Sequence, residues 1–456
     1  MVSKLRVDMP NYARAISPSC LVRLKNNFPS RAKSSVYAGA KEPISLQSDL
    51  YGGPNMRLIT PCIEVICPDT DPPDTTPRRG HKRILLPMSE QPFGVLIHGA
   101  GWVSTQHIAA FNRNPAARVL AVCSRTRAGA ERRITEAGIA EAAAYDDFSR
   151  ALRHPGVDIV SICTPQHLHY ENVLEAAAAG KHLVIEKPAA LSMEELERMR
   201  AAVERTGVRT VVSFVLRWNP LVRTLKSLSA EGAFGRIYSV EADYLSHNGP
   251  WWAGWKDTCS RRNGVSAMLV AGCHAIDTVR WLASGGEPRP ANPVEVFAMA
   301  GGYRKGQTEA YDPTTNTWVT GVPPMEYDGL EVALIQFDNG VLGKVSVNFD
   351  CVMPYRLPLR LFGDRGTAMD NRVWSRKFPD QRDWVELPVI QPDSSDVHHH
   401  PFQAQMDHFL DCLRRGVESH CNLADAIQTH CVVFAALESY RTRRPVSLRP
   451  AAGGVR

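Results

Sequence analysis

Short apolar runs alternate with amphipathic stretches from about residue 93 onward. The runs expected to be buried strands are FGVLIH (93–98), RVLAVC (118–123), DIVSIC (158–163), HLVIE (182–186) and VRTVVSFVL (208–216). Residues between them have helical spacing, and the helix that begins at Ser192 has Glu195 three positions on, a capping box, and ends at Gly207. Strands alternating with helices indicate a parallel sheet covered on both faces. We therefore predict a doubly wound α/β domain over residues 88–216.

The pattern changes after Pro220, where a helix through Leu228 is followed mainly by strands. These are RIYSVEADYL (236–245), PVEVFAMAG (293–301), GLEVALIQFDN (329–339), GVLGKVSVNFD (340–350) and YRLPLRLFG (355–363). The turn residues 338–340, Asp-Asn-Gly, are typical of an antiparallel hairpin. A helix over about 267–281 and two helical stretches within 402–441 complete the pattern. Residues 217–456 are thus predicted to be an α+β domain with a mostly antiparallel sheet.

Residues 1–87 have no sustained period and are rich in Pro, Ser and Arg. They hold 13 Lys/Arg against 7 Asp/Glu, whereas the remaining chain has 40 of each. A disordered extension, a targeting peptide and a start codon chosen too early all fit this segment. We predict a dispensable, disordered extension.

The neutral balance beyond residue 87 gives no support to nucleic-acid binding, and no apolar run has the length of a membrane span. The eleven cysteines form no CxxC pair, which favours reduced thiols and a cytoplasmic location. The run His398-His399-His400 suggests a metal, but no second ligand spacing supports one, so no metal site is predicted.

The first strand leads into a glycine-rich turn that opens a helix, the context in which a GxGxxG-type run binds a dinucleotide. The residues predicted to contact the cofactor here are Gly99, Gly101, Trp102, Val103 and Ser104. Ser124 and Arg125 follow the second strand, where an acid would favour NAD. An arginine there suits the 2′-phosphate of NADP, so NADP is favoured over NAD, although Arg125 as a solvated loop residue stays open.

The next strands end in further candidate contacts, because ligands bind beyond the carboxyl ends of parallel strands. Thr164 and Pro165 follow the third strand, and His169 fits a cofactor contact and a structural histidine about equally well. Glu186 and Lys187 end the fourth strand beside the same crevice. A lysine there can hydrogen-bond a substrate hydroxyl, and a cis peptide bond before Pro188 suits a tight turn.

The second domain has its own candidate residues for chemistry. His274 and Asp277 lie three positions apart on a predicted helix, where a histidine can accept a proton near neutral pH. Trp251 and Trp252, in HNGPWWAGWK (247–256), suit the face of a sugar, although a packed loop fits equally well.

Five stretches together, GAGWVS, CTPQHLH, EKP, Arg217-Trp218-Asn219-Pro220 and GCHAID, resemble the glucose–fructose oxidoreductase / inositol dehydrogenase / rhizopine-catabolism (Gfo/Idh/MocA) family over about residues 93–448. The resemblance implies an N-terminal Rossmann domain, a C-terminal open sheet that forms a homo-oligomer interface, and NAD(P)-dependent chemistry on sugars, cyclitols and polyols. It implies a substrate and nicotinamide contact for Lys187, acid/base chemistry for His274 and a cofactor contact for Arg217. Val270 departs from the family pattern, since many members have an aspartate there.

We therefore expect hydride transfer between a carbinol carbon of a sugar, glycoside or cyclitol and nicotinamide. Lys187 and His274 would handle the hydroxyl proton, with Trp251, Trp252 and Asp277 as further substrate contacts. Two alternatives stay open: a glycosidase that oxidises its substrate transiently with bound NAD, and a non-catalytic cofactor-binding regulator.

Overall fold

The computed structural model describes residues 21–25, 62–66, 91–252, 254–392 and 400–448. The chain divides into a unit over residues 1–85 and a second unit from residue 86 onward. In the first unit, β1 (Leu21–Lys25) pairs with β2 (Cys62–Ile66) in antiparallel register. The segment predicted to be a disordered extension thus includes this strand pair among its described residues. Each strand, LVRLK or CIEVI, has a charged residue inside an apolar run too short to stand out as a period.

The second unit begins with a six-stranded parallel sheet in the order β5-β4-β3-β6-β7-β8. Its strands are β3 (Phe93–His98), β4 (Ala117–Cys123), β5 (Ala143–Tyr145), β6 (Val157–Ile162), β7 (His182–Ile185) and β8 (Thr210–Val212). From β3 the chain adds β4 and β5 on one side, and it then crosses back to add β6, β7 and β8 on the other side of β3. That reversal makes a crevice at the carboxyl ends of β3 and β6, where doubly wound folds bind dinucleotides.

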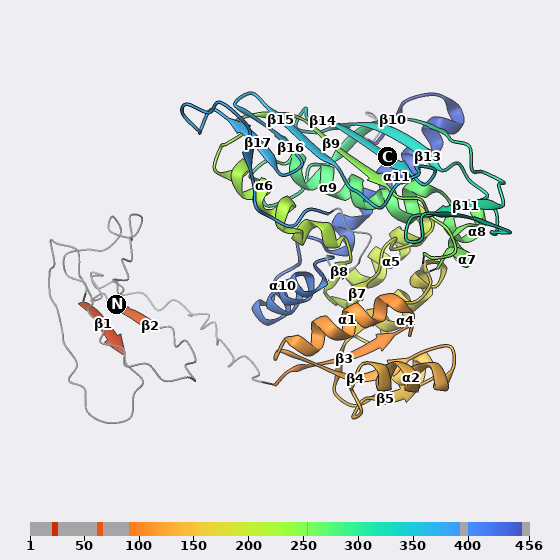
Figure 1. Ribbon diagram of the computed structural model, residues 1–456. Coiled ribbons are helices and arrows are strands. Elements are labelled where there is room, and N and C mark those ends of the chain that lie inside the picture. Colours follow the sequence, from red (N-terminus) through yellow and green to blue (C-terminus); the bar gives the residue numbers. More distant parts are fainter. Residues whose placement is uncertain (1–20, 26–61, 67–90, 253, 393–399, 449–456) are drawn as a thin grey trace, which may run out of the picture. The chain divides into compact units, whose positions relative to one another are not determined.

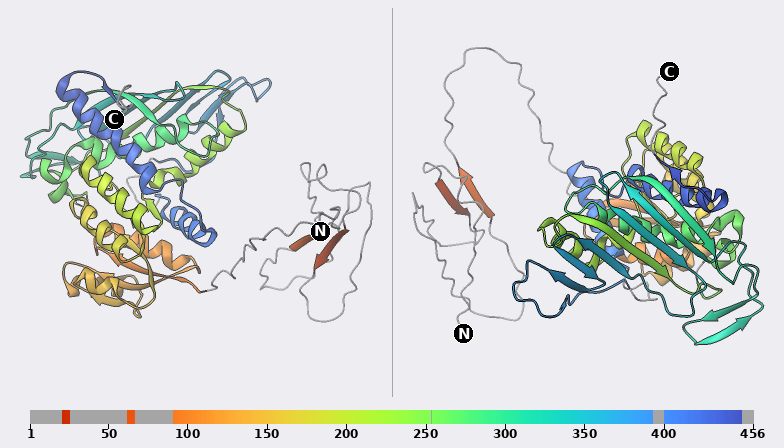
Figure 2. Two further views of the ribbon diagram at one scale, coloured as in Figure 1. Left: turned by 180° about the vertical axis from the view of Figure 1, so that it is seen from behind. Right: turned by 90° about the horizontal axis from the view of Figure 1, so that it is seen from above.

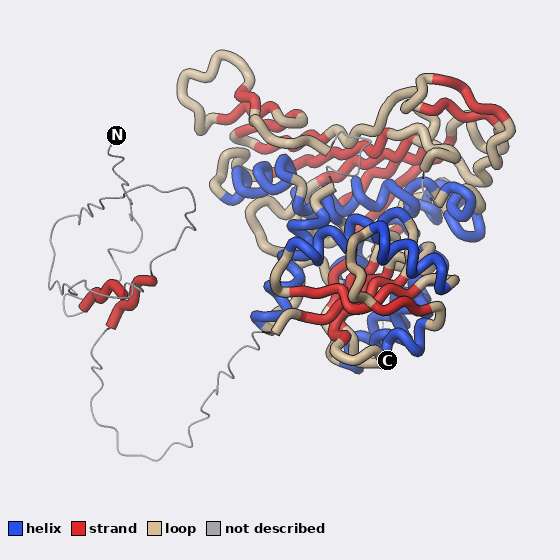
Figure 3. The backbone as a smooth tube through the Cα atoms, turned by 60° about the horizontal axis from the view of Figure 1, so that its bottom comes forward, coloured by secondary structure: helices blue, strands red, loops and turns tan. Residues whose placement is uncertain are grey.

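Helices lie on both sides of this sheet, as Figure 3 shows, which confirms the predicted α/β domain. They are α1 (Trp102–Arg113), α2 (Arg127–Glu136), α3 (Phe148–Leu152), the 3₁₀ turn η1 (Gln166–Leu168), α4 (His169–Ala178) and α5 (Met193–Thr206). The predicted capping of α5 is confirmed: the Ser192 hydroxyl accepts a hydrogen bond from the Glu195 amide, and Gly207 has φ +69°.

The last predicted strand of this sheet is much shorter than its apolar run suggested. VRTVVSFVL was expected to be a strand over 208–216, but only Thr210–Val212 is, and a 3₁₀ turn, η2 (Val215–Trp218), follows. The apolar run continues because Phe214, Val215 and Leu216 are buried where η2 packs against helices of the second domain. Periodicity alone does not separate these two kinds of burial.

The second sheet has nine strands in the order β18-β17-β16-β15-β9-β14-β13-β10-β19, mostly antiparallel. They are β9 (Ile237–Leu245), β10 (Pro293–Gly301), β13 (Leu330–Phe337), β14 (Leu342–Asn348), β15 (Leu359–Gly363), β16 (Gly366–Met369), β17 (Arg372–Ser375), β18 (Val385–Glu386) and β19 (Val446–Ser447). The hairpin predicted at residues 338–340 is confirmed between β13 and β14. Only β9 and β14 pair in parallel.

Helices of the second domain pack against one face of this sheet (Figure 1). The elements that contact the sheet are the π-helical turn η3 (Met268–Gly272), α9 (Cys273–Ala283) and α11 (Leu423–Thr442). The domain also has α6 (Pro220–Ala230), α7 (Trp255–Thr258), α8 (Arg261–Gly264) and α10 (Phe402–Arg415), and α10 packs against α1. In the right-hand view of Figure 2 the opposite face of the sheet is seen with no described helix across it. A separate hairpin, β11 (Glu309–Asp312) and β12 (Thr317–Thr320), interrupts the connection from β10 to β13. In the described part of the chain, no helix is both long and apolar enough to cross a membrane.

Candidate active site

A cleft of about 1210 Å³ opens at the carboxyl ends of the parallel strands. Gly99, Ser124, Thr164 and Lys187, which follow β3, β4, β6 and β7, all line it. Residues of the second domain, among them His274, complete its wall. The volume exceeds the roughly 300–1,000 Å³ that holds one drug-sized ligand, so a cofactor and a substrate fit together.

The glycine-rich turn after β3 is shaped for a diphosphate. Gly99 has φ +106°, and a Cβ there would lie 2.5 Å from the carbonyl of Cys163, so only glycine fits. A Cβ on Gly101 would meet no atom within 4 Å, which leaves the start of α1 open toward the cleft. α1 has no acidic residue in its first turn and no side-chain cap, so its free amides can receive an anion. These features fit a dinucleotide.

Trp102 and Val103 line the cleft as predicted, but Ser104 does not. Its side chain is fully buried, and its hydroxyl donates a 2.6 Å hydrogen bond to the carbonyl of Gly101. Ser104 therefore serves the close packing of helix against sheet rather than a cofactor contact.

The end of β4 presents cations to the cleft. Ser124, Arg125 and Arg132 line it, and Arg125 forms no ion pair with any described residue. Arg127, by contrast, is engaged by Glu131 at 2.9 Å across the surface of α2.

Thr164, Pro165 and His169 all border the cleft after β6. The Thr164 hydroxyl donates to the side chain of Asn172 at 2.8 Å. His169 is buried, with Nδ1 2.8 Å from the Pro188 carbonyl and Nε2 2.9 Å from the Thr164 carbonyl. Because both ring nitrogens are taken, this geometry favours the structural interpretation of His169.

Glu186 faces away from solvent toward α1. Its Oε1 lies 2.9 Å from Nε2 of His107, a fully buried histidine whose Nδ1 lies 2.7 Å from the Ser161 hydroxyl. Burial alone would lower the pKa of His107, but Cys163 and Glu186 raise it to about 10, so the ring is an imidazolium. Burial likewise opposes charge on Glu186, yet His107 keeps the pKa of that carboxyl below its usual value. The pair of Glu186 and His107 therefore joins the end of β7 to α1, the helix that begins at the glycine-rich turn.

Lys187 follows directly and points into the cleft. Its Nζ donates a 3.1 Å hydrogen bond to the carbonyl of Val270 and lies 5.9 Å from the ring centre of Trp252. The cis peptide bond predicted before Pro188 is confirmed. Val270 lies in the π-helical turn η3, so the group of the second domain that contacts the ammonium is a backbone carbonyl.

His274 faces the same end of the cleft from the first turn of α9. It is 4% exposed, and its Nδ1 has no hydrogen-bond partner among the described residues. Burial, and then the charges of Lys187 and His400, lower the pKa of His274 well below its ordinary value. A neutral, buried imidazole with a free nitrogen can accept a proton from a bound hydroxyl.

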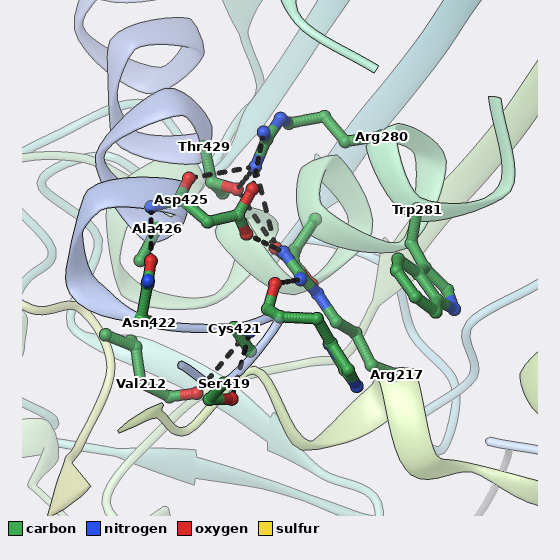
Figure 4. A network of polar contacts seen from close by, with 12 residues as sticks. Val212, Arg217, Arg280, Trp281, Ser419, Cys421, Asn422, Asp425, Ala426 and Thr429 are labelled. Carbon is green, nitrogen blue, oxygen red and sulfur yellow. Dashed lines mark hydrogen bonds and ion pairs between the residues drawn. The ribbon is translucent and has the colours of Figure 1, made fainter. Parts of the chain in front are cut away.

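Arg217 and Asp277 were predicted to contact cofactor and substrate, but neither lines the cleft. Figure 4 shows Arg217 in a buried network beside α11, where its Nε lies 2.7 Å from the Asp277 carboxylate. Asp425 accepts hydrogen bonds from Arg217 and, at 3.0 Å, from Arg280. All eleven residues of α9 are buried, so His274 and Asp277 face different partners although they are one turn apart.

The carboxylates of Asp277 and Asp425 lie near the Cys421 thiol at distances that would suit a metal. The guanidinium groups already occupy those oxygens. Burial favours the neutral form of Asp425, but Arg217 and Arg280 hold its pKa below the usual value.

Of the three histidines at 398–400, the first two lie outside the described residues, and His400 lines the cleft.

Several lining residues were not predicted from the sequence. They are His98, Gln166, Tyr244, Tyr355 and His400. His98 stacks on Phe148 with ring centres 3.8 Å apart, and its Nδ1 is buried without a partner in the described part of the chain. The sequence signal that could have identified His98 as a lining residue is its position directly before Gly99. Tyr244 and Tyr355 come together only through the pairing of the second sheet.

Two family models match the chain in sequence. The Gfo/Idh/MocA "oxidoreductase family, NAD-binding Rossmann fold" matches residues 93–214, and the "GFO/IDH/MocA C-terminal domain" matches residues 222–369. The chain belongs to the Gfo/Idh/MocA family. Its first domain is accordingly a nicotinamide-dinucleotide-binding fold, and the predicted architecture of the two domains is confirmed.

Similar proteins include dehydrogenases of sugars and cyclitols. Levoglucosan dehydrogenase of Pseudarthrobacter phenanthrenivorans is 32% identical over 206 residues, 44% of this chain and about half (51%) of that protein. The scyllo-inositol 2-dehydrogenase (NAD(+)) of Bacillus subtilis is 25% identical over 73% of this chain and 90% of its own length. A crystal structure of an NAD binding oxidoreductase from Klebsiella pneumoniae superposes with a TM-score of 0.67 and 22% identity, covering 79% of this chain and all of that one.

Proposed function

We propose that this chain is a dehydrogenase or reductase that transfers hydride between a carbinol carbon of a sugar, glycoside or cyclitol and a nicotinamide cofactor. One observation carries the proposal: Lys187 and His274, whose Nδ1 has no hydrogen-bond partner among the described residues, face the same end of the cleft. The relatives named levoglucosan dehydrogenase and scyllo-inositol 2-dehydrogenase support the substrate class.

In this proposal the residues divide the work at one hydroxyl group. The ammonium of Lys187, held by the carbonyl of Val270, donates a hydrogen bond to the substrate oxygen and orients it. His274 is neutral and accepts the hydroxyl proton during oxidation, or returns it during reduction. A nicotinamide cofactor held at the glycine-rich turn of Gly99 and Gly101 would supply the acceptor or donor of the hydride. Tyr244, stacked parallel to His274, limits where that ring can move.

The test is Lys187→Met, which keeps the length of the side chain and removes its charge. We expect turnover to fall by about 10²–10⁴ while the cofactor still binds. Lys377→Met makes the same change on a half-exposed lysine remote from the cleft lining and serves as the control. Near-normal turnover by a folded Lys187→Met protein would refute the assignment. Release of free sugar without net change in nicotinamide absorbance would instead identify a glycosidase.

NADP is the proposed cofactor. Ser124 carries no charge that would repel a 2′-phosphate, and Arg125 and Arg132 line the cleft beside it. A charge-assisted contact is worth about 1.5–3 kcal/mol, or roughly ten- to a hundredfold in affinity. Dissociation constants for both cofactors should favour NADP in the wild type and NAD in Ser124→Asp. Equal or tighter binding of NAD by the unaltered protein would contradict this choice.

The open face of the second sheet is the proposed contact with another copy of the chain. Met299 and Leu334 are 68% and 55% exposed on neighbouring strands, and Tyr238 and Leu342 are also exposed. An apolar face of this kind marks an interaction surface. Light scattering should give a multiple of the chain mass, and Met299→Lys with Leu334→Lys should reduce it, whereas Thr320→Lys should not. A monomeric wild type would rule out this contact.

A further inference from the structure

The β11–β12 hairpin lies outside both sheets and still contributes to the cleft. Pro313 and Thr314, at its tip, line the same cleft as Lys187 and Trp252. The tip is a defined turn: Asp312 accepts hydrogen bonds from the Thr314 amide at 2.8 Å and from its hydroxyl at 2.6 Å. Figure 1 shows β11 beside α7 and α8 at one end of the second sheet.

A buried histidine holds this hairpin against the sheet. His247 is 1% exposed, and its Nε2 accepts a 2.9 Å hydrogen bond from the amide of Tyr311 in β11. Because an amide only donates, Nδ1 must carry the ring proton, which it donates to the carbonyl of Cys351 at 3.1 Å. Burial, and next the charge of Arg304, lower the pKa of His247 to about 4, so the ring stays neutral.

The same histidine also positions an indole of the cleft wall. Nε1 of Trp251 donates a 3.2 Å hydrogen bond to the carbonyl of His247, and the indole lies over Gly249, where a Cβ would clash with the ring. The ring of Trp318 in β12 packs edge-on against His247 with centres 5.9 Å apart. His247 therefore contacts both the hairpin and the indole, and links them in one wall of the cleft.

Proton handling at a single hydroxyl requires only the end of the cleft that holds Lys187 and His274. The cleft wall also includes the apolar side chains of Trp251 and Pro313 and the hydroxyl group of Thr314. A single sugar ring bound at Lys187 and His274 does not need these additional contacts. Of the described lining residues contributed by the second domain, none is a lysine or arginine, so they offer a phosphate or carboxylate no such cation.

We infer that the β11–β12 hairpin and Trp251 form a subsite for the second ring of a neutral glycoside, and that His247 is its positioning residue. The inference rests on the proposed function, since it places the oxidised ring at Lys187 and His274. The second ring, a sugar or an aromatic aglycone, stacks on the indole and contacts the tip. One ring contact corresponds to roughly two- to twelvefold in affinity.

The experiment compares methyl and phenyl β-glycosides of glucose, galactose and xylose by calorimetry, using the full chain saturated with NADP. We expect a phenyl glycoside to bind about tenfold more tightly than its methyl partner. Thr314→Tyr fills the subsite and should bring the ratio of dissociation constants to within about threefold. Thr320→Tyr makes the same change on the same hairpin, outside the cleft lining, and should keep the wild-type ratio.

His247→Phe keeps an aromatic ring and removes both hydrogen bonds. It should raise KM for the phenyl glycoside about tenfold and KM for the methyl glycoside by less than about threefold, and His247→Gln should recover part of the difference because its amide oxygen can accept from Tyr311. Equal affinities in the wild type, a preference that survives Thr314→Tyr, or a panel in which no phenyl glycoside binds would each overturn the subsite. Preferential binding without turnover would sustain the subsite and refute the proposed dehydrogenase.

Discussion

The buried pair of His107 in α1 and Glu186 at the end of β7 gives the sharpest test of how these two elements are joined. His107→Leu removes the imidazolium and leaves the Glu186 carboxylate, 8% exposed, without its charged partner. Breaking a buried pair from one side costs about 3–5 kcal/mol, because the remaining charge stays out of water. We expect a loss of that size in the free energy of unfolding.

The pH dependence of stability gives the same pair a second signature. Between pH 6.5 and about pH 10 the folded state keeps the proton on His107 and the unfolded state loses it. The unfolded state then binds fewer protons, so this contribution is complete below pH 6.5 and declines as pH rises toward 10, by up to about 1.4 kcal/mol per pH unit. Glu186 acts at the opposite end: its lowered pKa gives stability above pH 4.5 that is lost as pH falls.

The assay is urea unfolding of the wild type and His107→Leu at pH 6.5, 8 and 9.5. The wild type should lose stability across this series, and the variant should start lower and show a flatter dependence. His154→Leu, at a half-exposed histidine bonded to Tyr145 rather than to a carboxylate, is the control. A double-mutant cycle with Glu186→Gln measures the coupling. A loss below about 1 kcal/mol at pH 6.5, with an unchanged slope, would refute a charged pair.

Three further predictions concern the network, the proton acceptor and the first unit. Arg217→Met should lower the free energy of unfolding by about 3–5 kcal/mol, because the buried carboxylate of Asp277 loses the guanidinium that binds both of its oxygens, whereas Asp425 keeps Arg280. Arg223→Met at an exposed neighbour should change it by less than about 0.5 kcal/mol, and equal effects in urea titrations would contradict this. Because the pKa of His274 is lowered, kcat/KM for oxidation should stay level as pH falls to 6.5 and decline only below it; an inflection at pH 6.5 that disappears in His274→Gln would show an ordinary pKa. A chain that starts at Met88 should keep its melting temperature and cofactor affinity, and a loss of either in differential scanning fluorimetry or calorimetry would give the first unit a role.

The strand ends could be placed from the sequence because one rule governs them. Buried apolar runs that alternate with helices must form a parallel sheet, and the carboxyl ends of its strands meet at one edge. Gly99, Thr164 and Lys187 lie within one cleft for that reason alone. The glycine-rich turn and the cis bond before Pro188 are equally local, since each depends on a few consecutive residues.

Contacts between distant segments could not be read in the same way. Arg217 and Asp277 are separated by 60 positions, and α9 is buried on every side, so no apolar stripe indicates which partner each residue meets. The β11–β12 hairpin consists of mostly polar four-residue strands, and its role at the cleft depends on His247, a residue 64 positions before Tyr311. Neither relation leaves a periodic signal.

Glu186, Lys187 and Pro188 meet three separate requirements at the junction of the two domains. The carboxylate of Glu186 is bound to the dinucleotide helix, the ammonium of Lys187 reaches the π-helical turn of the second domain, and the carbonyl of Pro188 is held by His169. A shift of either domain would therefore move the ammonium relative to the glycine-rich turn. In the proposed reaction that ammonium orients the substrate hydroxyl, and misplacement of a reacting group by about 1 Å can cost 10²-fold in rate. We conclude that substitutions at His107 or His169, whose ring nitrogens all have protein partners, will affect turnover through the position of Lys187.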